Sequence, residues 1–208
     1  MPKDTFFNLS KEKRDRIIQG AMKVFSTQAF NDASISEIIR NADISRGSFY
    51  QYFDDKIDLY KYLIGLFKKN YHSLMLKKFQ DHDGDFYLGF KAYSFFYIRS
   101  IRESEKFGFF ENLFLSMNYQ LNRENINVLF TTDNKLRLYD VINLDNVRIS
   151  DQDELMEVLQ FLHEILNSAI MEGFWRSYTI EETQEAYLKR LDWVFYGIVL
   201  EEQRGDEN

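Results

Sequence analysis

The chain has 208 residues, 45% of them hydrophobic, which is enough for one good-sized core or two small ones and makes disorder unexpected. No apolar run approaches the ~20 residues that span a bilayer, and the charged N-terminal region lacks the apolar stretch of a signal peptide. These features predict a soluble, cytoplasmic protein with no membrane partner. Cysteine is absent, so disulfides, thiolate nucleophiles and cysteine-bound zinc are excluded, and no cofactor is expected.

The distribution of proline and of charge narrows the fold class. The only proline is Pro2, so no later residue interrupts a helix in this way, and an all-α fold is favoured. The net charge is −7, but residues 1–53 contain eight lysines and arginines against six aspartates and glutamates. A slightly basic head on an acidic body suits a small DNA-reading module joined to a second part.

The first predicted helix covers about residues 10–28. Ser10 is a good N-cap residue because its hydroxyl can accept a hydrogen bond from a backbone N–H of the first turn. Apolar side chains then recur at the i, i+4, i+7 and i+8 spacing that places them on one helical face. They are Ile17, Ala21, Val24 and Phe25.

A second, short helix is predicted after the polar residues Asn31 and Asp32. The run from Ser34 to Glu37 has the form of a capping box, in which the hydroxyl and the carboxylate each satisfy a backbone N–H at a helix start. Two turns are too few for a stable isolated helix, so this one must pack against its neighbours. Its apolar face consists of Ile35, Ile38, Ile39 and Ala42.

A third short helix is predicted to follow the interruption at residues 43–45, with Ser45 as its N-cap and with Phe49 and Phe53 facing inward. Two short helices joined by a three-residue turn describe a helix-turn-helix. The outward side offers a charge, hydroxyls and an amide but no aliphatic side chain, which suits hydrogen bonding to phosphates and base edges. Its residues are Arg46, Gly47, Ser48, Tyr50, Gln51 and Tyr52.

The run from Ile38 to Leu59 resembles the DNA-binding signature of the TetR family of bacterial regulators, and the resemblance spans about residues 17–60. It rests above all on the sequence Ile-Ser-Arg-Gly-Ser-Phe-Tyr-Gln-Tyr-Phe over residues 44–53. The chain departs from the family pattern at three positions, where alanine, glycine and glutamate are usual. These are Ile39, Asp43 and Ile57. Aspartate tolerates the left-handed backbone that glycine usually supplies, so the turn is expected to survive.

The resemblance implies that residues in and around the third helix contact an operator. Arg46 and Gln51 are the expected base readers, because guanidinium and amide groups pair bidentately with guanine and adenine edges. Gly47 would let the backbone approach DNA closely. The full expected set is Ser34, Ser45, Arg46, Gly47, Ser48, Tyr50, Gln51, Tyr52 and Lys56.

Several of these residues have phosphate-binding or alternative roles. Ser34 and Tyr50 would mainly meet phosphates, and Lys56, in the first turn of a fourth helix capped by Asp55, would supply another phosphate contact. Ser34 caps its own helix in either case. For Tyr52, packing in the core is an equal alternative, because a tyrosine pair in an aromatic-rich chain is usually core or interface.

The resemblance also implies how the chain is divided and how it acts. Residues 1–55 would form the helix-turn-helix DNA-binding domain, and residues 56–208 a helical ligand-binding and dimerisation domain. The chain would then be a regulator, most commonly a repressor, that binds a palindromic double-stranded operator as a homodimer. An unknown small-molecule effector, apolar or amphipathic, would release it from the operator.

Further helices are predicted in the remainder from apolar spacing, caps and interrupting loops, while residues 118–150 are expected to form loops with short helices. The last two helices begin near Ser150 or Asp151 and at a second capping box, Thr179 to Glu182. Being antiparallel, they can pair with those of a second copy as a four-helix bundle, which is how TetR-like homodimers form. The predicted helices cover residues 56–80, 86–102, 106–117, 151–175 and 179–203.

The 20 phenylalanines and 13 tyrosines could line an apolar ligand cavity between helices or fill a tight core, and core packing is the commoner role for any one of them. His163 could offer a polar contact, although a lone histidine in a helix is more often structural. The candidates lie on inward-facing stripes and are Phe67, Tyr71, Tyr93, Phe96, Phe110, Phe114, Met117, Phe161, His163 and Phe174.

Two other classes of function fit the sequence less well. An enzyme is not supported, because the three histidines show no HExxH or paired metal spacing and the common glycine-rich catalytic motifs are absent. The run from Asp81 to Asp83 is interpreted as a solvated loop instead of a metal site. A helical protein-interaction adaptor without ligand sensing does not explain the hydrogen-bonding face at residues 45–52.

Overall fold

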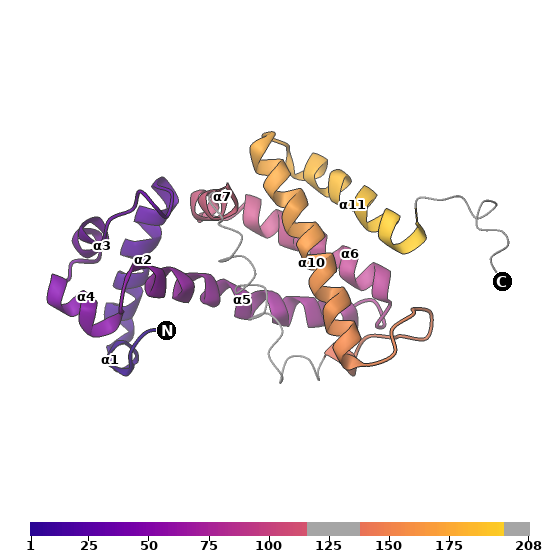
Figure 1. Ribbon diagram of the computed structural model, residues 1–208, viewed down its shortest axis with the longest axis horizontal. Helices are drawn as coiled ribbons and strands as arrows, with labels where there is room; N and C mark the ends of the chain where they lie inside the picture. The colour runs from indigo at the N-terminus through magenta and orange to yellow at the C-terminus, as the bar shows by residue number, and fades with distance from the viewer. Residues whose placement is uncertain (116–137, 198–208) are drawn as a thin grey trace. The chain divides into compact units, whose positions relative to one another are not determined.

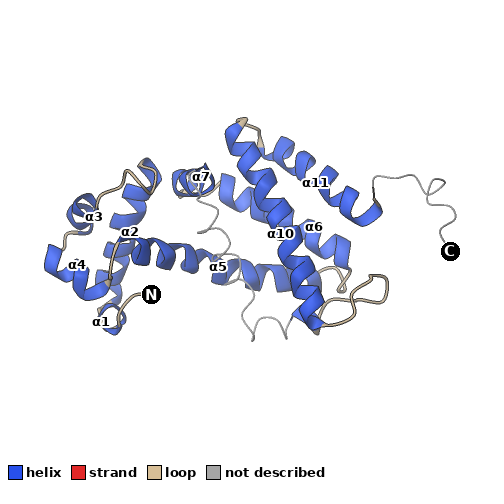
Figure 2. Cartoon of the chain, viewed as in Figure 1, coloured by secondary structure: helices blue, strands red, loops and turns tan. Residues whose placement is uncertain are grey.

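The computed structural model describes residues 1–115 and 138–197, except for the side chains of residues 68–70, and every long regular element in these ranges is a helix (Figures 1 and 2). The all-α prediction is therefore confirmed. The described residues form two compact units, one from Met1–Leu74 with residues 100–115 and the other from Met75–Arg99 with residues 138–197. Helices α5 (Lys56–Gln80) and α6 (Phe86–Arg102) contribute residues to both units.

Local capping signals set where the helices of the first unit begin. Ser10 accepts a hydrogen bond from the first turn of its helix at 3.3 Å, and Ser45 does the same at 3.0 Å. Ser34 and Glu37 form the capping box. These three predicted helix starts are confirmed. Besides α5, the helices of this unit are α1 (Asp4–Phe7), α2 (Lys11–Thr27), α3 (Ile35–Ala42), α4 (Arg46–Tyr52) and α7 (Phe107–Leu115).

The short helices of the first unit are held by the burial of their apolar faces. Phe49 and Phe53 are fully buried. Helices α2 and α3 approach each other closely at Gly20, where a Cβ atom would lie 2.6 Å from the backbone nitrogen of Ala42. This packing stabilises helices that are too short to stand alone. The predicted core face of α2 is at most 3% exposed and consists of Ile17, Ala21, Val24 and Phe25.

Helix α7 belongs to the first unit because it packs against α2. Asn112 Nδ2 donates to the carbonyl oxygen of Phe25 at 3.0 Å. The compact units therefore do not follow the chain in two consecutive blocks. The predicted domains, residues 1–55 and 56–208, divide the chain by function and stay a prediction.

The second unit is built on an antiparallel pair of helices that lie side by side (Figure 1). Asp151 accepts two hydrogen bonds from the first turn of one helix, and Thr179 begins the other with the predicted capping box, so both predicted starts are confirmed. The two helices touch closely at Gly173, where a Cβ atom would lie 2.6 Å from Thr183 Oγ1. They are α10 (Gln152–Trp175) and α11 (Ile180–Tyr196).

Helix α11 also packs against α6 and ends earlier than the sequence predicts. Ser94 Oγ of α6 donates to the buried hydroxyl of Tyr187 at 2.9 Å. The predicted end near residue 203 is wrong, because Gly197 takes φ 81° and ends the helix as its C-cap. Residues 198–208 lie outside the described part of the chain.

Candidate nucleic-acid interface

The turn between α3 and α4 has the backbone that the sequence predicts. Asp43 takes φ 50° and ψ 55°, the left-handed conformation usually given to glycine, so the expected tolerance of aspartate at this position is confirmed. Arg16 of α2 reaches this turn, with Nη1 3.7 Å from Asp43 Oδ2 and Nη2 3.5 Å from the Asp43 carbonyl oxygen. The turn is thus tied to α2, which helps to fix the direction in which α4 leaves it.

The polar side chains at the start of α4 hold one another in place. Ser45 Oγ accepts from the Ser48 N–H at 3.0 Å and lies 2.9 Å from Ser48 Oγ. Arg46 Nη2 donates to the Tyr50 hydroxyl at 3.4 Å, and its guanidinium carbon lies 5.6 Å from the centre of the Tyr50 ring. The pairs Ser45–Ser48 and Arg46–Tyr50 are each about one helical turn apart. These contacts restrict the side chains although they are not buried.

The outer face of α4 combines exposure with hydrogen-bonding capacity. Its inner side is formed by the buried rings of Phe49 and Phe53. Its outer side offers a guanidinium, an amide and hydroxyls, which can meet base edges and phosphates. We call this set the outer face of α4; it consists of the exposed Ser45, Arg46, Gly47, Tyr50 and Gln51 and the half-buried Ser48.

Packing within the chain does not require the glycine at position 47. A Cβ atom on Gly47 would meet only Ser45 Oγ, at 3.8 Å, which is an ordinary contact. Gly20 differs, because a Cβ atom there would collide with the backbone of α3. Glycine destabilises a helix by ~0.5–1 kcal/mol relative to alanine. Gly47 therefore keeps space open on the outside of α4 at a cost in helix stability.

Lys56 is half-buried, and its ammonium is directed at the loop between α2 and α3. Its Nζ donates to the carbonyl oxygens of Phe30 and Ala33, both at 2.6 Å, and of Asn31 at 3.4 Å. It also lies 4.5 Å from the centre of the Phe30 ring. Burial lowers the pKa of Lys56 from its usual value. The ammonium braces the loop between α2 and α3 against α5, which differs from the expected phosphate contact because its donors are directed at carbonyls.

Two further members of the expected contact set make contacts within the chain. Tyr52 is 5% exposed, and its ring centre lies 6.2 Å from that of Phe6, as its core alternative requires. Ser34 Oγ accepts from the Glu37 N–H at 3.1 Å and donates to the Glu37 carboxylate at 3.0 Å. Hydrogen bonds from Gln28 and Ser34 hold the pKa of Glu37 below its usual value. Tyr52 therefore packs in the core beneath α4, whereas Ser34 caps α3 and is half-buried, so its phosphate contact stays a prediction.

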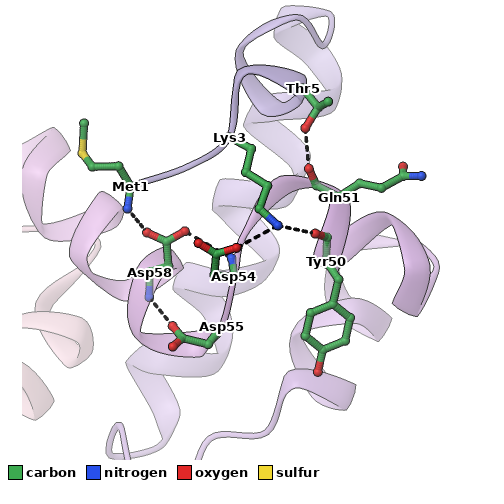
Figure 3. Close-up of polar contacts among 8 residues, drawn as sticks. All are labelled: Met1, Lys3, Thr5, Tyr50, Gln51, Asp54, Asp55 and Asp58. Carbon is green, nitrogen blue, oxygen red and sulfur yellow. Dashed lines mark hydrogen bonds and ion pairs between the residues drawn. The ribbon is translucent and has the colours of Figure 1, made fainter.

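An N-terminal arm, residues 1–9, which the sequence does not predict, contains α1 and lies against α4 (Figure 3). Phe6 is fully buried, with its ring centre 4.9 Å from that of Phe53. Lys3 and Thr5 bond to the backbone of α4. A helix of four residues has no readable periodicity, so the aromatic pair beginning at Phe6 is the only local signal that the arm is structured.

Some of the residues expected to line a ligand cavity lie in the first unit. They are Phe67, Tyr71, Phe110 and Phe114. The ring centres of Phe67 and Phe110 lie 4.9 Å apart. Phe67 also lines a pocket of about 110 Å³, together with Ile18, Met22, Leu63, Leu66 and Lys106. Small-molecule sites usually measure roughly 300–1,000 Å³, so a drug-sized ligand requires this pocket to enlarge. Met117 lies outside the described residues.

The other candidates lie in the second unit and do not form one lining. Tyr93 and His163 are buried with ring centres 6.3 Å apart, and Phe174 is also buried. Phe96 and Phe161 are 48% and 52% exposed, so they do not face the interior as expected. Helical spacing alone did not separate the buried side of α10 from its exposed side.

Two other kinds of site were sought in residues 1–115 and 138–197. No cluster of acidic and histidine side chains in these ranges could hold a metal ion. None of the helices described there is both long enough and apolar enough to cross a membrane. In the loop that begins at Asp81, the carboxylate of that residue lies 3.6 Å from Lys78 Nζ.

The chain matches two family models and several known regulators. Residues 17–63 match the model of bacterial regulatory proteins of the tetR family, and residues 85–198 match the tetracyclin repressor-like C-terminal domain. The HTH-type transcriptional regulator HbdR of Aromatoleum sp. (strain CIB) is 45% identical over 51 residues, which are 24% of this chain and 22% of HbdR. The HTH-type transcriptional regulator AcrR of Shigella flexneri is 33% identical over 76 residues, 36% of this chain and 35% of AcrR. The chain thus matches about a fifth to a third of the length of these relatives.

A solved structure extends the likeness of fold over most of the chain. The fatty acid degradation regulator FadR from Bacillus halodurans has a TM-score of 0.63 and 15% identity, and the match covers 92% of this chain and 98% of that one. At this identity the likeness concerns the arrangement of the helices.

Proposed function

Because the chain belongs to the TetR family of DNA-binding bacterial transcriptional regulators, we propose that it is a repressor that binds a palindromic operator as a homodimer. A small apolar or amphipathic molecule releases it. Residues 1–55 read the DNA, and residues 56–208 bind the effector and form the dimer. The observation that carries this proposal is the outer face of α4, an exposed hydrogen-bonding surface on a helix-turn-helix.

The outer face of α4 divides into base-reading and phosphate-binding groups. Arg46 and Gln51 read base edges, since a guanidinium and an amide can each make two hydrogen bonds to one base. Ser45, Ser48 and Tyr50 bind phosphates through their hydroxyls. The missing side chain at position 47 allows the backbone to approach the DNA. Tyr52 packs beneath this surface and Lys56 braces the loop between α2 and α3. Ser34 caps α3, and its hydroxyl also meets a phosphate.

The homodimer forms through α10 and α11, because both helices expose large apolar side chains. Trp175 is the most exposed of them, at 78%. Large apolar side chains that gather on one exposed surface mark interaction sites. When the helix pairs of two copies pack together, they make a four-helix bundle, and the two-fold axis accounts for a palindromic operator. The exposed apolar residues are Phe161, Met171 and Trp175 on α10 and Trp193, Val194 and Tyr196 on α11.

The effector-binding part, residues 56–208, meets the DNA-reading part at a pocket between α2 and α5 in the first unit, and the effector enters there. Ile18 and Met22 of α2 form one wall, and Leu63 and Phe67 of α5 form another. A ligand larger than about 110 Å³ has to separate these helices to fit. Since α2 carries α3 and α4, such a ligand binds best to a conformation in which the DNA-reading helices are displaced, and binding shifts the population toward it.

The test is selection from a library of random duplexes at moderate salt, followed by sequencing of the retained DNA. We expect a palindrome whose half-sites lie about one helical turn, ~34–36 Å, or a multiple of it apart. Recovery of no sequence by a folded, dimeric protein contradicts the proposal and favours a helical adaptor that acts through its apolar faces.

A further inference from the structure

The last carbonyl groups of α4 are bonded by the N-terminal arm. The final carbonyls of a helix have no partners within it and need others. In α4, Phe49 O still accepts from the Phe53 N–H at 2.9 Å, and the next three carbonyls are taken by the arm. Lys3 Nζ donates to the carbonyl oxygen of Tyr50 at 2.9 Å and Thr5 Oγ1 to that of Gln51 (Figure 3). The Lys3 N–H donates to the carbonyl oxygen of Tyr52 at 2.9 Å.

The arm that makes these bonds is itself anchored to the rest of the first unit. The buried ring of Phe6 lies 5.2 Å, centre to centre, from the ring of Tyr62 in α5. Arg14 of α2 donates to the carbonyl oxygens of Phe7 and Leu9 at 2.5 and 2.8 Å. The arm therefore connects the end of α4 to α2 and α5 independently of the chain that continues from α4.

The ammonium of Lys3 is held within this arrangement. Besides its bond to the carbonyl of Tyr50, it lies 2.8 Å from Asp54 Oδ1, just beyond the end of α4. The Asp54 N–H in turn donates to Asp58 Oδ2 at 3.3 Å, and Asp58 also pairs with the backbone nitrogen of Met1 (Figure 3). Met1 and Lys3 of the arm are thus both attached to the junction between α4 and α5.

We propose that Lys3 and Thr5 are positioning residues for DNA recognition, which clamp the backbone of Tyr50, Gln51 and Tyr52 so that the outer face of α4 keeps one orientation. This inference rests on the proposed DNA-binding function. Recognition needs its groups held to about 0.5 Å and 10–20°. A seven-residue helix has little rigidity of its own, and the clamp acts at the residue proposed to read bases. Lys3 acts on operator affinity through the helix backbone and not through a phosphate.

The test compares the full-length protein with the double variant Lys3→Met, Thr5→Val, which removes both side-chain donors and keeps similar volume. The probes are the duplex recovered by selection and the same duplex with one base pair changed in each half-site. We expect affinity for the selected duplex to fall about 5- to 20-fold and discrimination against the changed duplex to shrink. The slope of log affinity against log salt stays unchanged, because no phosphate contact is lost. Thr5→Ser, which retains the hydroxyl, should behave as the wild type.

Two outcomes overturn the proposal. A slope reduced by ~0.9 for each Lys3 in the dimer identifies a direct phosphate contact. Unchanged affinity and discrimination mean that the arm does not position α4. Thr5→Val alone is the second variant, since it leaves the charge untouched if the double variant folds poorly.

Amide hydrogen exchange of the free protein separates this inference from the proposed function. We expect the Phe53 amide to exchange faster in the double variant while the amides in the middle of α2 keep their protection. If the wild type binds no duplex, the DNA-binding proposal fails, and exchange still reports whether the clamp exists. Equal exchange in both proteins refutes the clamp even when DNA binding is confirmed.

Discussion

The outer face of α4 and the exposed apolar side chains of α10 and α11 are both open to solvent, and their chemistry differs. The first offers hydroxyls, an amide and a guanidinium beside a glycine, whereas the second offers tryptophan, phenylalanine and methionine. Polar groups suit a highly charged, hydrogen-bonding partner, and large apolar groups suit a protein partner. Exposure alone therefore does not define a site, and the residue types on an exposed helix indicate the class of its partner.

We expect the strongest effect from placing charges among the exposed apolar side chains of α10 and α11. In Phe161→Glu with Trp193→Glu, carboxylates replace rings that we propose to be buried between two copies. We expect the dimer dissociation constant to rise about 100-fold, or ~2.7 kcal/mol, as measured by sedimentation velocity. Ile57→Glu, at an exposed apolar residue of the first unit, is the control and should leave the dimer intact. A double variant that stays dimeric at nanomolar concentration would rule out this interface.

The polar side is tested next. Arg46→Ala and Gln51→Ala should each weaken binding to the selected duplex by ~1–3 kcal/mol and relax the preference at one base pair of each half-site. Fluorescence anisotropy on a panel of single-base variants measures both effects. Gln160→Ala makes the same change on α10 and should have no effect. If Gln51→Ala weakens every duplex equally, Gln51 binds the backbone of the DNA and does not read bases.

Lys56 tests whether a polar group close to α4 stabilises the fold or binds DNA. Lys56→Met removes three donors to backbone carbonyls and should lower the free energy of unfolding by ~1–3 kcal/mol, measured by urea denaturation. The salt dependence of DNA binding should not change, because the ammonium faces the α2–α3 loop. If the slope of log affinity against log salt is smaller by ~0.9 per subunit in Lys56→Met, Lys56 makes the phosphate contact that the sequence suggests.

Gly47 offers a test in which stability and binding move in opposite directions. Gly47→Ala should raise the free energy of unfolding by ~0.5–1 kcal/mol, because the new methyl group meets no obstacle and alanine favours the helix. It should also weaken operator binding, since the methyl group occupies the space proposed for DNA. Gly20→Ala is the contrasting control and should destabilise the protein. Unchanged operator affinity in Gly47→Ala would show that the backbone at position 47 does not lie close to the DNA.

The smallest expected effect concerns pH. The pKa of Glu37 is lowered in the folded state, so the folded chain binds this proton less tightly than the unfolded chain. The stabilisation by its carboxylate is present above the usual pKa and is lost as pH falls through the lowered value. Thermal melts of the wild type and Glu37→Gln between pH 6 and pH 3 should therefore converge on acidification. A constant difference across this range would contradict a role for the ionised carboxylate.

The features that the sequence predicts correctly are set by interactions between neighbouring residues. Ser10, Ser34, Ser45 and Thr179 each bond to an N–H within three residues, so the helix starts can be predicted from the neighbouring sequence. The left-handed turn at Asp43 is similarly a property of one residue. The helix starts and this turn together determine where the helix-turn-helix lies in the sequence and which residues form the outer face of α4.

The residues that could not be predicted depend on contacts between distant parts of the chain. Lys56 turns inward because the α2–α3 loop, more than twenty residues earlier, presents its carbonyls to it. Lys3 matters because it meets Tyr50, and nothing near either residue indicates the other. Phe96 and Phe161 share their helical stripes with buried residues, and only the packing of whole helices decides which side is covered.

Gly47 also has a consequence for how this sequence would evolve in the laboratory. Because its replacement by alanine improves the isolated fold and impairs the proposed activity, selection for heat resistance alone should remove this glycine early. Selection for operator binding at the same temperature should retain it and find its stabilising substitutions elsewhere. The identity of residue 47 in two such populations would therefore record which of the two pressures had acted.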